Sequence, residues 1–319
     1  MKKIALLTSG GDAPGMNAAI RAVVRTAIYY DVEVLGVRRG YTGLIEKDFI
    51  RMNLGSVADI IQRGGTVLLT ARCDEFLTGQ GQEKAVANLR EEEVEGVIAI
   101  GGDGTFRGAL ELDKLGMPTI CIPGTIDNDI PCTTATIGFD TVVNTVVDAI
   151  NKIRDTATSH ERIFVIEVMG RKSGFIALEA GLASGAESIL IPEFPINIDA
   201  VVKNIKRGNR RGKKHSIIVI AEGAADAMQL TKEIMEKSGL ETRLSILGYI
   251  QRGGGPSAQD RLLASRMGAE AVNLLLRGER KKMLGVDGEK IRNFDIDWAI
   301  NQSKTINLDD YRLAGILSI

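Results

Sequence analysis

The chain has 319 residues, of which 44% are apolar and 25% are charged, and its formal net charge is −1. This composition is typical of a globular protein with a sizeable core, and the near-zero charge argues against binding nucleic acid. No run approaches the ~20 apolar residues of a membrane span, and the N-terminal apolar run is too short for a signal peptide. The three cysteines form no CxxC pair, which favours reduced thiols.

Short apolar runs alternate with amphipathic ones in the first part of the chain. The runs predicted as buried parallel strands are Ile4–Leu7, Val32–Val37, Val67–Thr70, Val97–Ile100 and Thr119–Ile122. The intervening patterns predict helices, for example over Met16–Tyr30 and Thr105–Leu115. This alternation indicates a doubly wound α/β sheet, in which ligands bind beyond the carboxyl ends of the strands.

Two glycine-rich segments follow predicted strands and lead into predicted helices. In Thr8–Gly15, glycines precede a helix N-terminus with free N–H groups, which suits a phosphate, although a plain tight turn remains the alternative. The second segment, Gly101–Thr105, contains an acidic residue. Asp103 among phosphates favours bound Mg²⁺, and a helix N-cap is the alternative. Both segments therefore predict a phosphate-binding edge of the sheet.

A pair of carboxylates follows the next predicted strand, in Pro123–Asp129. Asp127 and Asp129 would point to one side if this segment is extended. One suits a general base for a hydroxyl and the other a metal ligand, as in kinase chemistry, whereas an Asx-turn is the alternative. The two histidines, His160 and His215, lie outside these loops. A Ser-His-Asp triad and a His-rich metal site are therefore not expected.

A long amphipathic helix is predicted over Phe139–Arg154, because apolar residues recur there on one helical face. A second α/β series follows, with apolar runs at Phe164–Val168, Ile189–Ile191, Ile217–Ala221 and Leu244–Leu247. The expected fold class is α/β, with two similar doubly wound lobes, mainly parallel sheets and the active site in the cleft between the lobes. The tail after about Gly285 is the least informative part.

Five arginines lie near the ends of predicted strands, where a guanidinium could hold a phosphate through its bidentate fork. They are Arg72, Arg162, Arg171, Arg243 and Arg252. Each one taken singly is more often a solvated surface residue, but five of them beside phosphate loops reverse that preference. A separate basic cluster, Arg210–His215, is either the solvated end of a helix or a second anion site.

Together these motifs resemble the bacterial ATP-dependent 6-phosphofructokinase family over nearly the whole chain. The matching segments are LTSGGDAPGMNAAIR, GGDGT, PGTIDNDI, IRDTATSHER, VMGR, RRGKKH, AEG and QRGG. GGDGT also occurs in NAD kinases and diacylglycerol kinases, but PGTIDND and QRGG are not expected there. The resemblance implies a cytoplasmic glycolytic enzyme that moves the γ-phosphoryl group of MgATP onto fructose 6-phosphate, in a homotetramer with shared active sites. Its lobes would be residues 1–138 plus 256–304 for ATP and 139–255 plus 305–319 for the sugar.

The resemblance also implies roles for the matching positions. Catalysis would use Asp127 as base for the sugar 1-hydroxyl, with Arg171, Arg72, Thr125 and Gly11. The ATP site would contain Gly11, Arg72, Cys73, Gly102, Asp103, Gly104 and Thr105, and Mg²⁺ would bind near Asp103 and Asp129. The sugar phosphate would contact Thr125, Ile126, Asp127, Arg162, Met169, Gly170, Arg171, Glu222, Arg243, Tyr249 and Arg252. Of these, Arg162 and Arg243 would reach in from a neighbouring subunit.

A regulatory site is implied too, with ADP as activator and phosphoenolpyruvate as inhibitor. Its residues would be Arg21, Arg25, Asp59, Arg154, Gly185, Glu187, Arg211, Lys213, Lys214 and His215. Glu161 and Arg162 resemble the family's switch, in which the two side chains exchange places. Such an exchange would reverse the charge that faces the sugar phosphate.

The chain departs from the family pattern at three positions. Tyr249 stands where many members carry a sugar-binding histidine, Phe175 where some carry aspartate, and Gly255 where serine is common. A phenol can still donate a hydrogen bond, so we expect altered affinity rather than lost activity at Tyr249.

Donor choice in the wider family follows two positions. Pyrophosphate users tend to carry Asp at 104 and Lys at 124, and both positions are Gly here, which favours ATP. The alternatives are a pyrophosphate-dependent phosphofructokinase, a lipid or dinucleotide kinase that shares GGDGT, and a catalytically silent nucleotide-binding subunit.

Overall fold

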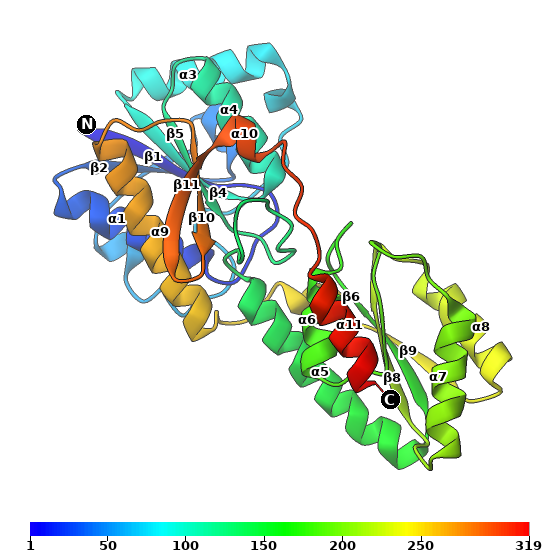
Figure 1. Cartoon of the computed structure of the whole chain (residues 1–319). Coiled ribbons are helices and arrows are strands. Elements are labelled where there is room, and N and C mark those ends of the chain that lie inside the picture. Colours follow the sequence, from blue (N-terminus) through cyan, green and yellow to red (C-terminus); the bar gives the residue numbers. More distant parts are fainter. Residues whose placement is uncertain (319) are drawn as a thin grey trace. The chain divides into compact units, whose positions relative to one another are not determined.

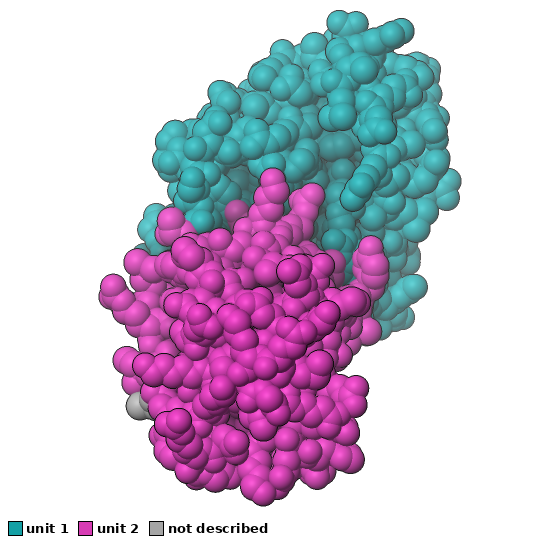
Figure 2. Space-filling model, turned by 90° about the vertical axis from the view of Figure 1, so that its right-hand side faces the viewer, with its two compact units in different colours: residues 1–126, 130–141, 252–304 teal, residues 127–129, 142–251, 305–319 magenta. Residues whose placement is uncertain are grey.

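The structure, a computed structural model, describes residues 1–318 and divides into two compact units. Unit 1 contains Met1–Ile126, Ile130–Thr141 and Arg252–Lys304, and unit 2 contains residues 127–129, 142–251 and, of the described residues, 305–318. Figure 2 colours unit 1 teal and unit 2 magenta. Within residues 1–318, no helix has both the length and the apolar character needed to cross a membrane.

Unit 1 is built on a seven-stranded sheet in the order β11-β10-β5-β4-β1-β2-β3. Its strands are β1 (Lys3–Thr8), β2 (Glu33–Val37), β3 (Phe49–Met52), β4 (Gly96–Gly101), β5 (Thr119–Pro123), β10 (Lys282–Asp287) and β11 (Lys290–Asp295). The five inner strands are parallel, whereas β3 and β11 run antiparallel at the two edges. The inner strands β1, β2, β4 and β5 are largely buried on both faces, which explains why they read as continuous apolar runs.

Helices cover both faces of this sheet. They are α1 (Met16–Tyr29), α2 (Tyr41–Glu46), α3 (Gly79–Glu91), α4 (Asp103–Lys114), α9 (Ala258–Leu276) and α10 (Ile296–Ala299). Side chains such as Ala5 and Leu7 pack with α2, α3 and α4 in one apolar cluster. Since neighbouring strand residues point to opposite faces, Ile4 and Leu6 face the other side, where α1 and α9 lie against each other (Figure 1).

Unit 2 has a four-stranded, fully parallel sheet in the order β7-β8-β6-β9. Its strands are β6 (Ile163–Val168), β7 (Ser188–Leu190), β8 (Ser216–Ala221) and β9 (Thr242–Ile246). Its helices are α5 (Phe139–His160, whose first turn belongs to unit 1), α6 (Phe175–Ala183), α7 (Ile198–Arg210), α8 (Ala227–Ser238) and α11 (Leu308–Leu317). One apolar cluster joins α7 and α8 to the sheet, while α6 and α11 pack together.

The mixed α/β class and the mainly parallel sheets are confirmed, but one predicted strand is wrong. Val67–Thr70 forms a turn and coil, in which Leu69 has a φ of +59° that no strand residue adopts. Leu68 is fully buried there, so the apolar run reflects burial rather than a strand. The strands β3, β10 and β11 were not predicted. The edge strands β3 and β11 lack a continuous apolar run, and the short buried run of β10 is interrupted by Gly285. The long helix extends six residues beyond the predicted end, to His160.

Candidate active site

The loops after β1 and β4 meet at one edge of the unit 1 sheet, because these strands are parallel neighbours. The Ser9 N–H donates to the Ile100 carbonyl at 3.1 Å, and the Thr105 hydroxyl donates to the Ser9 carbonyl at 3.0 Å. A Cβ at Gly101 would collide with Thr105 and Ser9, so only glycine allows this approach. The protein's own hydrogen bonds therefore hold the two glycine-rich loops together.

The glycines of these loops leave space and N–H groups at the same edge. Gly10 and Gly15 have φ values of +83° and +102°, which residues with a side chain rarely adopt. Helix α4 begins at Asp103, directly after Gly102, so its first N–H groups and its positive dipole end lie here. A Cβ at Gly104 would meet no atom within 4 Å. This combination suits the binding of a phosphate chain.

The loop after β5 joins this edge, because β5 is the other neighbour of β4. The Gly124 N–H donates to the Gly101 carbonyl at 2.9 Å. The Thr125 carbonyl accepts the Thr136 hydroxyl at 2.6 Å, and a Cβ at Gly102 would lie 3.8 Å from the Thr125 Cβ. The structure thus brings the three predicted loops together at one edge of unit 1.

Sequence reasoning missed a buried tyrosine that supports the loop after β4. The Tyr41 hydroxyl donates to the Thr105 carbonyl at 2.5 Å, and its ring stacks on Phe76 with centroids 4.1 Å apart. Burial raises the pKa of Tyr41 well above its usual value, so the phenol remains a hydrogen-bond donor. Gly108 on α4 makes room for this ring, since a Cβ there would lie 2.6 Å from it. No periodicity in the sequence marks Tyr41.

Two further residues predicted for ATP lie beside α2. The Arg72 carbonyl accepts the Thr42 hydroxyl at 3.5 Å, and the Arg72 side chain is exposed. Cys73 is half-buried against the apolar cluster of unit 1. Among residues 1–318, no carboxylate lies within ion-pair distance of the Arg72 guanidinium, which leaves its bidentate fork available for an anion.

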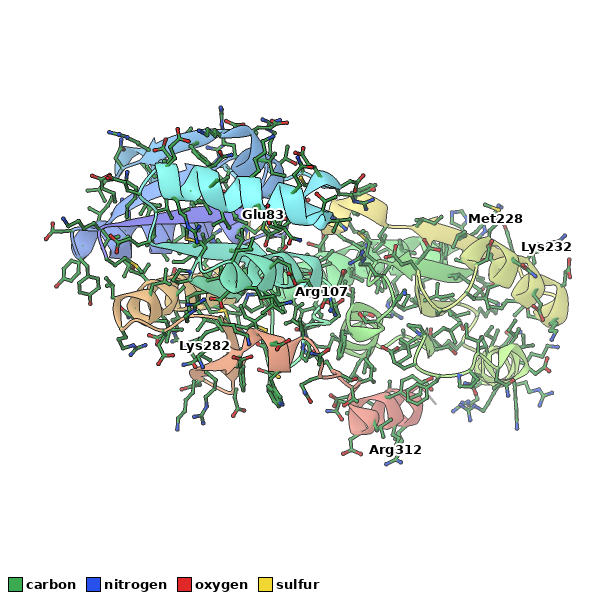
Figure 3. All side chains as sticks on the ribbon, turned by 90° about the horizontal axis from the view of Figure 1, so that it is seen from above. Glu83, Arg107, Met228, Lys232, Lys282 and Arg312 are labelled. Atoms are coloured by element: carbon green, nitrogen blue, oxygen red, sulfur yellow. The ribbon has the colours of Figure 1, made fainter. Side chains whose placement is uncertain are left out.

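Asp103, the predicted Mg²⁺ ligand, lies in the first turn of α4. Its carboxylate is 2.8 Å from the Arg107 guanidinium, one turn later, and this hydrogen bond raises the pKa of Arg107. Figure 3 labels Arg107 on this helix. In the described part of the chain, no three His, Cys, Asp or Glu side chains are grouped to hold a metal. A single exposed carboxylate fits a Mg²⁺ ion that is held mainly by phosphates and waters.

In unit 2, residues predicted for the sugar phosphate gather at the carboxyl end of β6. The Met169 N–H donates to Gln251 Oε1 at 3.1 Å, and the Arg171 N–H donates to Glu222 Oε1 at 2.7 Å. Gly170 and Arg171 have φ values of +139° and +53°, which produce a tight turn with an exposed arginine. Sequence reasoning missed Gln251, although it directly precedes one of the predicted arginines.

The predicted base, Asp127, is attached to this turn. The Ser173 hydroxyl lies 3.2 Å from the Asp127 carbonyl and 3.0 Å from the Gly170 carbonyl, both acceptors. Asp127 is only 5% exposed. Asn128 has a φ of +51°, so the segment is not extended, and the condition under which Asp127 and Asp129 would face one side is not met. Ser173 is a supporting residue that no sequence motif marks.

Arg162 directly precedes β6 and Arg243 is the second residue of β9, so both lie at the amino ends of these strands, opposite the turn after β6. The Arg162 Nε is 2.9 Å from the Glu241 carboxylate, and Arg243 pairs with the same carboxylate. These arginines lower the pKa of Glu241, with the Arg162 hydrogen bond as the largest cause. Met169 lies seven positions after Arg162, which is on the order of 20 Å along a strand. Within one chain, the structure does not bring this pair to the turn after β6.

Tyr249 and Arg252 follow β9 but belong to different units. Tyr249 lies in a short 3₁₀ helix, Gly248–Gln251, and is 81% exposed. Arg252 belongs to unit 1, where its guanidinium packs against Gly11 and lies 4.0 Å from the Asp12 carboxylate. A Cβ at Gly11 would meet only the tip of this flexible side chain, which can move aside, so the contact does not by itself require glycine.

Part of the predicted regulatory site forms a cluster in unit 2. Glu187 is 7% exposed and pairs with Lys213. Burial and then the charge of Lys213 lower the pKa of His215, and Arg154 lowers it further. Gly185 has a φ of +66°. The remaining predicted residues are Arg211 and Lys214, exposed in unit 2, and Arg21, Arg25 and Asp59, which belong to unit 1.

Known proteins resemble this chain over its full length. A family model described as phosphofructokinase matches residues 3–275. An ATP-dependent 6-phosphofructokinase from Halothermothrix orenii is 60% identical, and one from Bacillus subtilis is 57% identical, each with 100% of both chains covered.

Solved structures give the same picture of the fold. Phosphofructokinase from Saccharomyces cerevisiae has a TM-score of 0.89 and 35% identity, over 94% of this chain and 45% of that chain. Pyrophosphate-dependent phosphofructokinase from Marinobacter aquaeolei has a TM-score of 0.87 over 98% of this chain and 88% of that chain. Its identity is 23%, so this likeness concerns the fold only.

Proposed function

The chain belongs to the phosphofructokinase family and is a kinase, and we propose that it transfers the γ-phosphoryl group of MgATP to the 1-hydroxyl of fructose 6-phosphate in glycolysis. The observation that carries this proposal is the edge of the unit 1 sheet where the loops after β1, β4 and β5 are joined by hydrogen bonds. The N-terminus of α4 and the surrounding glycines offer N–H groups to a phosphate chain there. The 57–60% identity to ATP-dependent 6-phosphofructokinases supports this assignment.

ATP, rather than pyrophosphate, is the proposed donor. The open space at Gly104 leaves room for the nucleotide beyond the terminal phosphates. Gly124, the other position that differs in pyrophosphate users, is buried in this chain. A Cβ there would lie 2.9 Å from Ile100 Cγ2 and 3.4 Å from Met16 Cε. A lysine at 124 would therefore require repacking, which supports the ATP assignment.

Asp127 is assigned as the base. In phosphoryl transfer the base orients the hydroxyl and accepts its proton late, so the proton passes to a carboxylate oxygen of Asp127 as the new O–P bond forms and ADP leaves. The low exposure of Asp127 and the Ser173 contact to its backbone support this role, because both restrict its position. Arg72 and Arg171, both exposed, are assigned to charge stabilisation on the transferring group.

Mg²⁺ is the proposed metal, with Asp103 as its protein ligand and Asp129 as a second carboxylate. When bound, the ion neutralises negative charge on the phosphates. Asp103 would exchange its partner Arg107 for the ion. Both side chains of this pair are about half exposed, so the pair contributes at most about 1 kcal/mol and does not prevent that exchange.

Binding of the sugar phosphate is assigned to the turn after β6 together with residues from other parts of the chain. The proposed ligands are Thr125, Ile126, Asp127, Met169, Gly170, Arg171, Glu222, Tyr249 and Arg252. Arg162 and Arg243 lie near the far end of β6, so we assign them to the site of a neighbouring subunit in a homotetramer. Glu241 keeps this pair together, which supports their acting as one unit.

Regulation by ADP and phosphoenolpyruvate is proposed for the cluster around Glu187. The cluster contains cations that an anionic effector needs, and Glu187 pairs with one of them in the unliganded chain. Glu161 pairs with Lys214 at 2.8 Å, while Arg162 pairs with Glu241. The two adjacent residues of the proposed switch thus have separate exposed partners that can be exchanged.

The test is formation of fructose 1,6-bisphosphate from fructose 6-phosphate and Mg²⁺, with ATP or pyrophosphate in parallel. We expect turnover with ATP only, and a loss of about 10²–10⁴-fold in Asp127→Ser. Turnover with pyrophosphate only would contradict the donor assignment. No turnover with either donor would favour a silent nucleotide-binding subunit.

A further inference from the structure

The exposed face of α7 carries a row of cations. Lys203, Lys206, Arg207 and Arg210 recur at spacings of three, one and three residues, so they share one face of the helix. All four side chains are exposed. The row spans about 10 Å at the α-helical rise. These residues, with Asp199 and Val202, line a hollow of about 370 Å³.

The four cations have no ion-pair partner among residues 1–318. Lys206 donates only to a backbone carbonyl, that of Lys237, at 2.9 Å. The nearby cation Lys237, by contrast, is paired with two acids: Asp199, the single acid among the residues lining the hollow, and Glu233. Four like charges on neighbouring turns repel one another, so this face gains most from a ligand with several negative charges.

From this face we infer that α7 binds a soluble ligand that carries several phosphate groups in a row. Two arginines offer bidentate forks and two lysines offer point charges, the groups that suit phosphate oxygens. The inference goes beyond the proposed function and does not depend on it, because no α7 residue was assigned to the reaction or its regulation.

Two other classes of anion fit less well. A membrane-binding helix inserts its apolar face into lipid, but the apolar face of α7 (Val201, Val202 and Ile205) is buried in the core of unit 2. Single-stranded nucleic acid is held by aromatic rings that stack on bases, and the residues that line the hollow include no aromatic one. A polyphosphate chain needs neither feature.

The experiment measures binding of inorganic polyphosphate and tripolyphosphate to the full chain by calorimetry at several salt concentrations. The test variant combines Lys203→Gln, Lys206→Gln, Arg207→Gln and Arg210→Gln. The control variant removes equal charge from cations already paired with acids: Lys84→Gln, Lys114→Gln, Arg277→Gln and Arg312→Gln. Figure 3 labels Arg312 on α11. Circular dichroism verifies folding of both variants.

We expect the test variant to bind at least about tenfold more weakly, and the control to bind like the wild type. At roughly 0.7 per phosphate contact, the slope of log affinity against log salt should fall by about 3. Equal losses in both variants would overturn the proposal, because net charge would then explain binding.

Two further measurements address the cluster around Glu187, proposed above as the regulatory site, and lipids. Binding that survives in the test variant but is lost in Lys213→Gln would place the ligand in the regulatory cluster and overturn the proposal. Binding to vesicles of anionic phospholipid, without binding to free polyphosphate, would overturn it as well.

Discussion

Replacing Gly104 with Asp should weaken ATP binding without weakening the fold. A Cβ at this position meets no atom within 4 Å, and the backbone does not require glycine there. The position lies in the first turn of α4, where a carboxylate interacts favourably with the helix dipole by about 0.3–1 kcal/mol. We therefore expect the melting temperature of Gly104→Asp to stay the same or rise slightly.

The new carboxylate would face the proposed phosphate chain. Two unit charges 4 Å apart repel by about 4 kcal/mol at an effective dielectric constant of 20. Solvent exposure reduces this figure, so we expect a loss of about 1–3 kcal/mol, or about 5- to 150-fold in ATP affinity. Calorimetric titration with ATP, with and without Mg²⁺, measures the loss independently of turnover.

Gly104→Asn is the matched control, because it has nearly the same shape without the charge. If charge repulsion causes the loss, Gly104→Asn retains most of the affinity that Gly104→Asp loses. If the two variants lose affinity equally, steric exclusion is the cause and charge repulsion is not. If neither variant loses affinity, the phosphate chain does not bind at this edge.

Three further predictions concern other parts of the chain. Asp260→Asn should lower the free energy of unfolding by about 1–3 kcal/mol in denaturant titrations. Asp260 Oδ1 accepts the Gly138 N–H and Oδ2 accepts both the N–H and the hydroxyl of Thr141, and an amide nitrogen in either place could accept no hydrogen bond. Alkylation followed by mass spectrometry should show that Cys73 reacts more slowly when ATP is present, and equal labelling with and without ATP would contradict its placement in the ATP site. Cys121 should react only after unfolding, because burial raises its pKa and excludes the reagent. Burial lowers the pKa of His215, so the neutral side chain contributes stability above about pH 6.5, and this contribution is lost as pH falls through the lowered pKa. The melting temperature of His215→Gln should therefore fall less below pH 6.5 than that of the wild type.

The core of the fold was predictable because parallel strands buried on both faces are continuous apolar runs. β1, β4 and β5 are all of this kind, and each is followed by glycine where the chain turns into a helix or loop. The edge strands β3 and β11 were not predictable by the same signal. Three of the six residues of β11 are exposed, and its sequence, KIRNFD, has no apolar run.

The loops of the candidate site were predictable for a related physical reason. Where a Cβ would collide with the backbone of a neighbouring loop, the sequence must carry glycine. Gly101 marks such a place. Supporting side chains, such as Tyr41 and Ser173, act through hydrogen bonds to backbone carbonyls, among them those of Thr105 and Asp127, which are distant in the chain. Nothing local distinguishes them from other tyrosines and serines.

The arginines differ in which end of a strand they lie near, and this decides whether they can reach the ligand loops. Residues that follow a parallel strand gather with the ligand loops, whereas residues at its start gather at the opposite edge. Arg171 follows β6, but Arg162 precedes it and is held by Glu241 beside Arg243. Because β6 has six residues, Arg162 and Arg171 cannot reach one phosphate from a single chain. If all three arginines serve the same substrate, a second copy of the chain must supply Arg162 and Arg243, and the isolated subunit should bind the sugar phosphate poorly.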